Sequence, residues 1–309
     1  MHDGDLPLAV NFNATVDCDN GPCIDEFCPF EPCNPTPSPP TTQPGANPVG
    51  RIRVNDTQLG DEGLRRARIV AKRWFKIERT YTDNNGNFNI NKRFRNKVKL
   101  RIKFKNEDAL VRGVRRARLW QMFRTIAFTI GPFRGSQINT VSHTFQRTGA
   151  DDRTRGNRYW VGATVHNAIQ HFRALTANQG TGSLPHQKLR CFISNWGFIG
   201  SASAPLFAVR SSLRLDNEFI HRFLIRDVTT VLNVLLPVFV DMMKKQVDIA
   251  LSYRANNLND LNSDNITGTM FHELAHATFY RQCGHTWYTE FVDAVIWDGL
   301  FAGPALWPR

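Results

Sequence analysis

The sequence predicts an α+β protein, in which a small antiparallel β-sandwich module precedes a mixed α/β domain. Three observations support this prediction. Residues 49–106 hold short runs in which apolar and polar residues alternate. From Trp160 onwards apolar residues recur at helical spacing, and near the C-terminus an alternating run, a loop and an amphipathic run follow one another. With 41% hydrophobic residues among 309, the chain can bury a substantial core.

The first 33 residues form an acidic segment that contains four evenly spaced cysteines. Residues 1–50 carry seven acidic side chains and no Lys or Arg. Two local disulfides among Cys18, Cys23, Cys28 and Cys33 would suit an oxidising compartment, and a reduced, disordered tail is the alternative. Residues 34–48 contain six prolines and are predicted to be a linker. The N-terminus shows no signal peptide, and no apolar stretch is long enough to span a bilayer.

Residues 49–106 are predicted to form the β-sandwich module. Its expected strands include one over residues 65–77, and residues 83–86 ("DNNG") are expected to close a hairpin. Residues 97–105 ("KVKLRIKFK") alternate strictly, which predicts a half-buried strand with a cationic outer face. An anionic polymer is therefore a possible partner. The favoured alternative is a solvated face whose like charges discourage edge pairing, and nucleic acid is disfavoured because no aromatic residue is interleaved.

Residues 107–309 are assigned to the mixed α/β domain, although residues 107–158 show no clear pattern. A helix is expected from Trp160 to about Asn178, with Val161, Val165, Ala168, Ile169, Phe172 and Leu175 on its buried face. His166 and His171 lie beside that face, five residues apart, and are expected to be ordinary helix residues. Strands follow at 188–196 and 247–253, with a helical region at 213–245 between them.

The final helix, from about residue 265 to 283, has Ile266, Met270 and Leu274 on one apolar stripe and contains the sequence "HELAH". His272 and His276 are four apart and therefore point the same way, one turn apart, so that both can bind one Zn²⁺. Glu273 lies at the edge of the same face. Ser263 or Asp264 is expected to cap this helix and Gly284 to end it. The alternative is a core helix with two hydrogen-bonded histidines, but the complete motif favours the metal site.

Two stretches resemble known families. Residues 63–94 contain Thr82, Asp83, Gly86 and Phe88 in a Thr-Asp-x-x-Gly-x-Phe turn and resemble the transthyretin-like or carboxypeptidase-regulatory-like modules of bacterial surface proteins. From about residue 48 to 295 the chain resembles bacterial secreted or lipoprotein zincins that pair such a module with a His-Glu-x-x-His domain. This resemblance implies a secreted, cell-surface or periplasmic zinc metallopeptidase that acts on proteins or peptides. His272 and His276 would be its zinc ligands and Glu273 its catalytic carboxylate.

The third zinc ligand is left open by the sequence. Phe279 and Gln282 occupy the positions where metzincins place a Gly and a third His, so a gluzincin-like site with an acidic third ligand is expected. Glu290 and Asp293 are the candidates within the chain. In the similar proteins, however, the acidic ligand lies on a helix reached by a longer connection. We therefore expect the sequence to stop before its third ligand and this form to bind zinc weakly.

Two further points bear on function. Tyr288 or His285 could help to stabilise the oxyanion, but a packed aromatic and a solvated histidine are the favoured interpretations. The rival function is that of a surface binding or adhesion protein. In that case the zincin domain would be degenerate or incomplete, and the basic β module would bind the anionic polymer.

Overall fold

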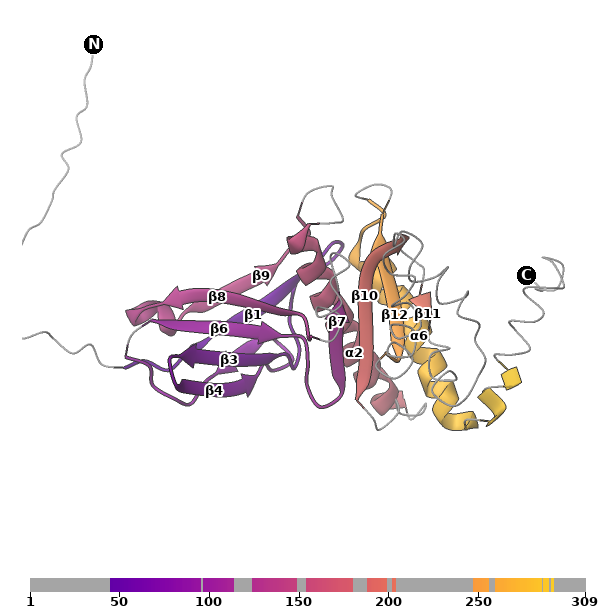
Figure 1. The fold of residues 1–309 in the computed structure, drawn as a ribbon, viewed down its shortest axis with the longest axis horizontal. Helices are drawn as coiled ribbons and strands as arrows, with labels where there is room; N and C mark the ends of the chain where they lie inside the picture. The colour runs from indigo at the N-terminus through magenta and orange to yellow at the C-terminus, as the bar shows by residue number, and fades with distance from the viewer. Residues whose placement is uncertain are drawn as a thin grey trace, which may run out of the picture. The chain divides into compact units, whose positions relative to one another are not determined.

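The computed structural model describes residues 45–95, 97–113, 124–148, 154–179, 188–198, 202–203, 247–255, 259–284, 286–288 and 290–291. They belong to a compact unit that begins at Thr42. The protein has the predicted α+β class (Figure 1). The cysteine-containing segment, most of the predicted linker and the predicted helical region at 213–245 lie outside the described residues.

Two four-stranded sheets occupy the N-terminal half of the described chain. In the first, β1 (Val49–Asp56) pairs antiparallel with β2 (Gly60–Gly63) and β5 (Asn87–Asn89), and parallel with β9 (Val141–Phe145). The second is antiparallel throughout, in the order β4-β3-β6-β8. Its strands are β3 (Arg68–Arg73), β4 (Lys76–Tyr81), β6 (Val98–Lys103) and β8 (Ala127–Phe133). As the alternation predicts, Val98, Leu100 and Ile102 of β6 are fully buried.

The third sheet is mixed and supports the two long helices. Its order is β11-β12-β10-β7, with β7 (Ala109–Gly113), β10 (Leu189–Phe198) and β12 (Ile249–Arg254) parallel and β11 (Ala202–Ser203) antiparallel. Helix α2 (Arg155–Gln179) packs against helix α6 (Ser263–Cys283), for example through the rings of Phe172 and Phe271, 5.5 Å apart. A short 3-10 helix, η1 (Gly135–Ile138), links β8 to β9.

Three local predictions are wrong in detail. Residues 65–77 form a hairpin rather than one strand, because the chain turns back at Trp74, where φ is +45°. The 83–86 turn exists but closes no hairpin, since β4 and β5 belong to different sheets. On α2, Leu175 is 47% exposed, so the buried face of the helix ends before this residue.

The β sheets reach beyond the boundary predicted at residue 106. Strand β9 pairs with β1 along residues 50–54, and β8 pairs with β6. One continuous core joins residues of all three sheets and both helices. At the N-terminal end, Ala46 exchanges two backbone hydrogen bonds with Phe94. The last residues assigned to the linker are therefore already paired with the N-terminal β region.

The turn between β4 and β5 explains the residues of the Thr-Asp-x-x-Gly-x-Phe pattern. The buried Thr82 hydroxyl donates to the Leu64 carbonyl and accepts from the Ala67 amide. The Asp83 carboxylate accepts from the backbone amides of residues 85 and 87, at 2.8 Å each. Gly86 has a φ of +79°, and its carbonyl accepts from Ile52 of β1 at 2.8 Å. The pattern therefore fastens one sheet to the other.

A buried amide on α2 ties this helix to the loop that joins β2 to β3. The side chain of Asn167 is 2% exposed and makes three hydrogen bonds. Its oxygen accepts from the Arg65 amide, and its nitrogen donates to the Gly63 carbonyl and to the Glu62 carboxylate, each at 2.9 Å. One side chain thus satisfies three polar groups of a segment that is about 100 residues away in sequence.

We expect Asn167→Ala to lower the free energy of unfolding by about 3 kcal/mol, because it leaves buried polar groups without partners. Thr176→Ala on the same helix removes only a bond from Oγ1 to the helix's own carbonyls. It should therefore change stability by about 0.5 kcal/mol or less. Urea unfolding of both variants checks the difference. Equal effects would mean that Asn167 does not anchor the loop.

His166, which the sequence suggests to be an ordinary helix residue, is fully buried, and burial lowers its pKa to about 4. The unfolded chain binds a proton at this histidine below about pH 6.5, whereas the folded chain does not until about pH 4. The free energy of unfolding therefore decreases as the pH falls from about 6.5 to about 4. The loss approaches about 1.4 kcal/mol per pH unit. In His166→Gln the unfolding free energy should fall less steeply between pH 6.5 and 4.5. Parallel pH profiles of the two proteins would contradict this.

Candidate metal centre

Helix α6 is fixed at both ends. Its N-cap is Asn262, whose side chain accepts from the Asn265 amide at 2.8 Å; the predicted caps Ser263 and Asp264 already lie inside the helix. The Ser263 hydroxyl instead bonds Thr57, in the turn between β1 and β2, at 2.8 Å. At the other end Gly284 has a φ of +79° and donates to the Tyr280 carbonyl. The predicted glycine end is thus confirmed.

The buried face of α6 orients the two histidines. Ile266, Met270, Leu274 and Ala277 are fully buried on the side that packs into the core. His272 lies on the opposite side and is exposed, and His276 is partly buried. Their rings meet at the surface of the helix, as the spacing of four predicts.

The geometry of the two histidines fits two positions of a zinc site. Their Nε2 atoms are 3.1 Å apart, with the ring planes at 87°. Two nitrogens about 2.05 Å from a tetrahedral zinc lie about 3.3 Å apart, so little adjustment is required. Burial, and then the charge of His272, lowers the pKa of His276. This favours the neutral imidazole that a metal requires.

Glu273 lies on the buried side of the pair. Glu273 is 5% exposed, and its carboxylate is close enough to Tyr288 to interact electrostatically with the phenol group. Burial, and then the Glu273 charge, raises the pKa of Tyr288. Tyr288 is 1% exposed and packs edge-on against Tyr280, with ring centres 5.1 Å apart. It is therefore a packed aromatic, as the sequence favours, but one that adjoins the candidate catalytic carboxylate.

The residues after Gly284 fold back on α6. Residues 286–288 and 290–291 are helical, and the rings of Trp287 and Phe291 lie 5.2 and 5.8 Å from that of Phe279. Glu290 is exposed beside this aromatic cluster. Asp293 and His285 lie outside the described residues. Within the described part of the chain, no three His, Cys, Asp or Glu side chains gather as a metal-binding group.

Sequence reasoning missed one feature of this region. The Thr57–Ser263 contact joins segments 206 residues apart, and no local pattern signals it. The approach of Tyr288 to Glu273 follows the turn at Gly284 and agrees with the alternative that placed Tyr288 near the site. The described helices include none long and apolar enough to cross a membrane.

Comparisons with known proteins give no family for this chain. No family model matches, and no curated protein matches. Among solved structures, a 9R-lipoxygenase from Cyanothece PCC8801 is 12% identical over 47% of this chain and 25% of that chain, with a TM-score of 0.18. This chain thus spans about a quarter of that protein, and so low a score supports no inference about fold or function.

Proposed function

We propose that the protein is a zinc-dependent peptidase, with His272 and His276 as metal ligands and Glu273 as general base. The observation that carries the proposal is the 3.1 Å separation of the two Nε2 atoms on one exposed helix face. The adjoining buried glutamate supplies the acid–base group that a hydrolytic centre needs, which supports the proposal.

The chemistry follows from the roles of these side chains. Zinc, when bound, acidifies its water and polarises a carbonyl group. The two imidazoles hold the metal at the helix surface, where substrate can reach it. Glu273, within the same turn of helix, would accept the proton of the attacking water and pass it to the leaving amine. Its largely water-excluded position strengthens its electrostatic interactions with neighbouring groups.

The sheet beside α6 suits an extended substrate. Strand β11 is antiparallel, ends the sheet within the described residues and contacts α6. An extended peptide can add to such a strand through backbone hydrogen bonds, which are indifferent to side-chain identity. We therefore favour an extended peptide as substrate.

The test is metal content and cleavage by the full chain. Equilibrated with excess zinc, so that even the weak site expected from the sequence is filled, the protein should bind about one zinc per chain by elemental analysis, and it should cleave an unfolded protein such as casein. Dipicolinate should remove zinc and activity together, and added zinc should restore both. Protein that binds zinc only non-stoichiometrically and cuts no peptide would refute the proposal and favour the rival binding function.

A second measurement concerns the third ligand. We expect Glu290→Ala to leave zinc affinity within about threefold, because the neighbouring rings of Trp287, Tyr288 and Phe291 face α6, and Glu290, off that face, is exposed. Asp293→Ala is the paired comparison. Zinc competition titrations decide the point. A tenfold or greater loss in one variant, typical of losing a metal ligand or its support, would identify that side chain.

A further inference from the structure

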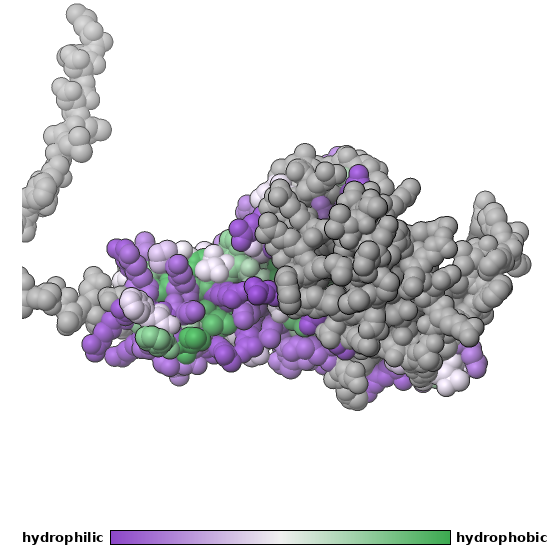
Figure 2. Space-filling view, viewed as in Figure 1, coloured by the Kyte–Doolittle hydropathy of each residue, from purple (hydrophilic) through white to green (hydrophobic). Residues whose placement is uncertain are grey.

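The outer face of the β4-β3-β6-β8 sheet is strongly cationic. The strand register places three cross-strand rows on this face: Ile77, Lys72 and Lys99; Arg79, Val70, Arg101 and Thr129; and Tyr81, Arg68, Lys103 and Ala127. We call these residues the cationic face. Six of the eleven are Lys or Arg and none is acidic. Figure 2 shows hydrophilic side chains over these strands, with smaller hydrophobic areas between them.

Edge protection does not account for these charges. The sequence favours an explanation in which like charges prevent pairing at a sheet edge. Strands β3 and β6, however, are the two inner strands of the sheet, and each is paired on both sides. On them Lys72 lies directly opposite Lys99, and Arg68 opposite Lys103. Like charges placed directly opposite each other destabilise a sheet. Neutral polar residues would keep this face of the inner strands solvated without that loss of stability.

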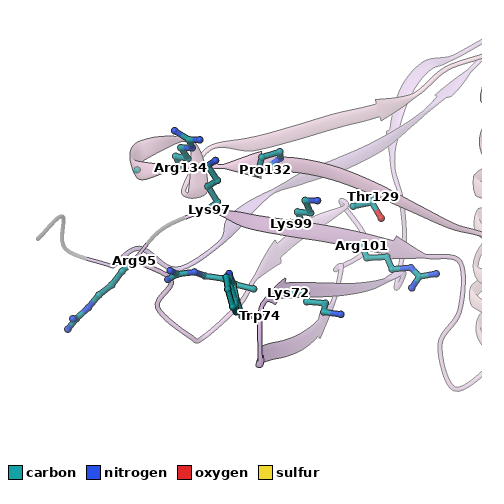
Figure 3. A pocket seen from close by; sticks show the side chains of 11 residues that line it. Lys72, Trp74, Arg95, Lys97, Lys99, Arg101, Thr129, Pro132 and Arg134 are labelled. Atoms are coloured by element: carbon teal, nitrogen blue, oxygen red, sulfur yellow. The ribbon is translucent and has the colours of Figure 1, made fainter.

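One end of this face is hollowed into a groove of about 1060 Å³ (Figure 3). We call it the cationic groove. Lys97, Lys99 and Arg101 follow β6 through the middle of the groove, Lys72 and Arg73 come from β3 beside it, and Arg95 and Arg134 complete the set. None of the described residues that line it is acidic. The groove and the rows share Lys72, Lys99 and Arg101. Burial, and then neighbouring cations such as Arg101 and Lys105, lowers the pKa of Lys103.

Aromatic rings are interleaved with the cations, contrary to the sequence-based expectation. Trp74 lines the groove and is 82% exposed, and Tyr81 on the cationic face is 45% exposed. Trp74 also adopts a φ of +45°, at a hairpin position that favours glycine. A tryptophan at this position adds backbone strain to the hairpin, and its exposed indole gains no packing in return. A ligand that contacts the indole would explain why the residue is there. The hairpin thus places a flat apolar ring among seven cationic side chains.

We propose that the cationic groove and cationic face bind single-stranded nucleic acid. Lysine and arginine side chains would contact successive phosphates along β6, where residues of one face recur about every 6.7 Å. Trp74 and Tyr81 offer planar surfaces on which unpaired bases stack. A bilayer is flat and would not enter a concavity, and a duplex hides the faces of its bases. An unpaired strand matches both the charge and the rings.

The first experiment separates a specific site from general attraction to a basic protein. Binding of fluorescein-labelled oligo(dT) to the full chain is followed by anisotropy at low salt with EDTA, which uncouples it from any metal site. Lys72→Gln/Lys99→Gln/Arg101→Gln should weaken binding at least tenfold and flatten the dependence on salt. Arg51→Gln/Lys92→Gln/Arg281→Gln removes the same net charge outside the groove and should change affinity less than threefold. Equal losses in the two variants would overturn the site.

The second experiment tests stacking. Trp74→Ala and Tyr81→Ala should each weaken oligo(dT) binding about 5- to 100-fold without altering the salt dependence, and Trp74→Phe should restore most of the loss. Heparin, a polyanion without bases, should be insensitive to Trp74→Ala. Oligo(dT) binding that ignores both aromatic substitutions would overturn the proposal. So would binding confined to heparin or to vesicles containing phosphatidylserine. Circular dichroism confirms that each variant is folded.

Discussion

Glu273→Gln should retain bound zinc and lose peptide cleavage by roughly 10²- to 10⁴-fold, the range for losing a general base. Glutamine keeps the shape of the buried side chain beside Tyr288, but it cannot take up a proton. His272→Ala and His276→Ala should lose zinc and cleavage together, because each removes one of the two facing Nε2 atoms.

The matched control is Glu78→Gln, which neutralises an exposed carboxylate on β4 that pairs with Lys92. It should leave zinc content and cleavage unchanged. Elemental analysis and single-turnover cleavage distinguish the variants. Glu273→Gln protein without zinc would mean that Glu273 supports the metal rather than acting on water.

The largest effect on stability is expected for Gly86→Ala. A Cβ at residue 86 would lie 2.0 Å from the carbonyl oxygen of Ile52, and the backbone there has a φ of +79°. The Ile52 carbonyl cannot move aside without breaking its contact with the turn, because Ile52 belongs to β1. We expect a loss of about 3–5 kcal/mol in unfolding free energy, combining a steric clash with backbone strain.

Gly60→Ala isolates the second contribution. Gly60 has a φ of +89°, but a Cβ there would meet no atom within 4 Å. It should therefore cost only about 1–2 kcal/mol, the strain of a left-handed backbone. Urea titration of both variants gives the two values, and equal losses would show that the turn relaxes away from Ile52.

The sequence predicted best those elements whose signals are local. The strict alternation of residues 97–105 located β6, and the spacing of Ile266, Met270 and Leu274 located the buried face of α6. Periodicity is sufficient there because one face is buried and the other solvated. Helix geometry likewise predicts that His272 and His276 lie on the same side of α6.

Non-local pairing was beyond the reach of the sequence patterns. The parallel pairing of β1 with β9 joins residues about 90 apart, and nothing in either strand specifies the other. The hairpin at Trp74 was missed because its turn uses a tryptophan where glycine is the usual signal. The exposed aromatic rings and the cationic side chains are brought to one face by the register of four strands, which no single stretch of sequence specifies. A third ligand for the proposed zinc site depends equally on tertiary placement.

The parallel contact between β1 and β9 also bears on how this protein can be divided. A fragment ending at residue 106 would lack β8 and β9, which pair with β6 and β1. In such a fragment β6 and β1 would each present unpaired backbone N–H and C=O groups, and another copy of the chain could pair with them. The two N-terminal sheets are therefore complete only when residues 127–145 are present. Cutting instead after Thr148 retains β8 and β9, so both sheets keep all their described strands.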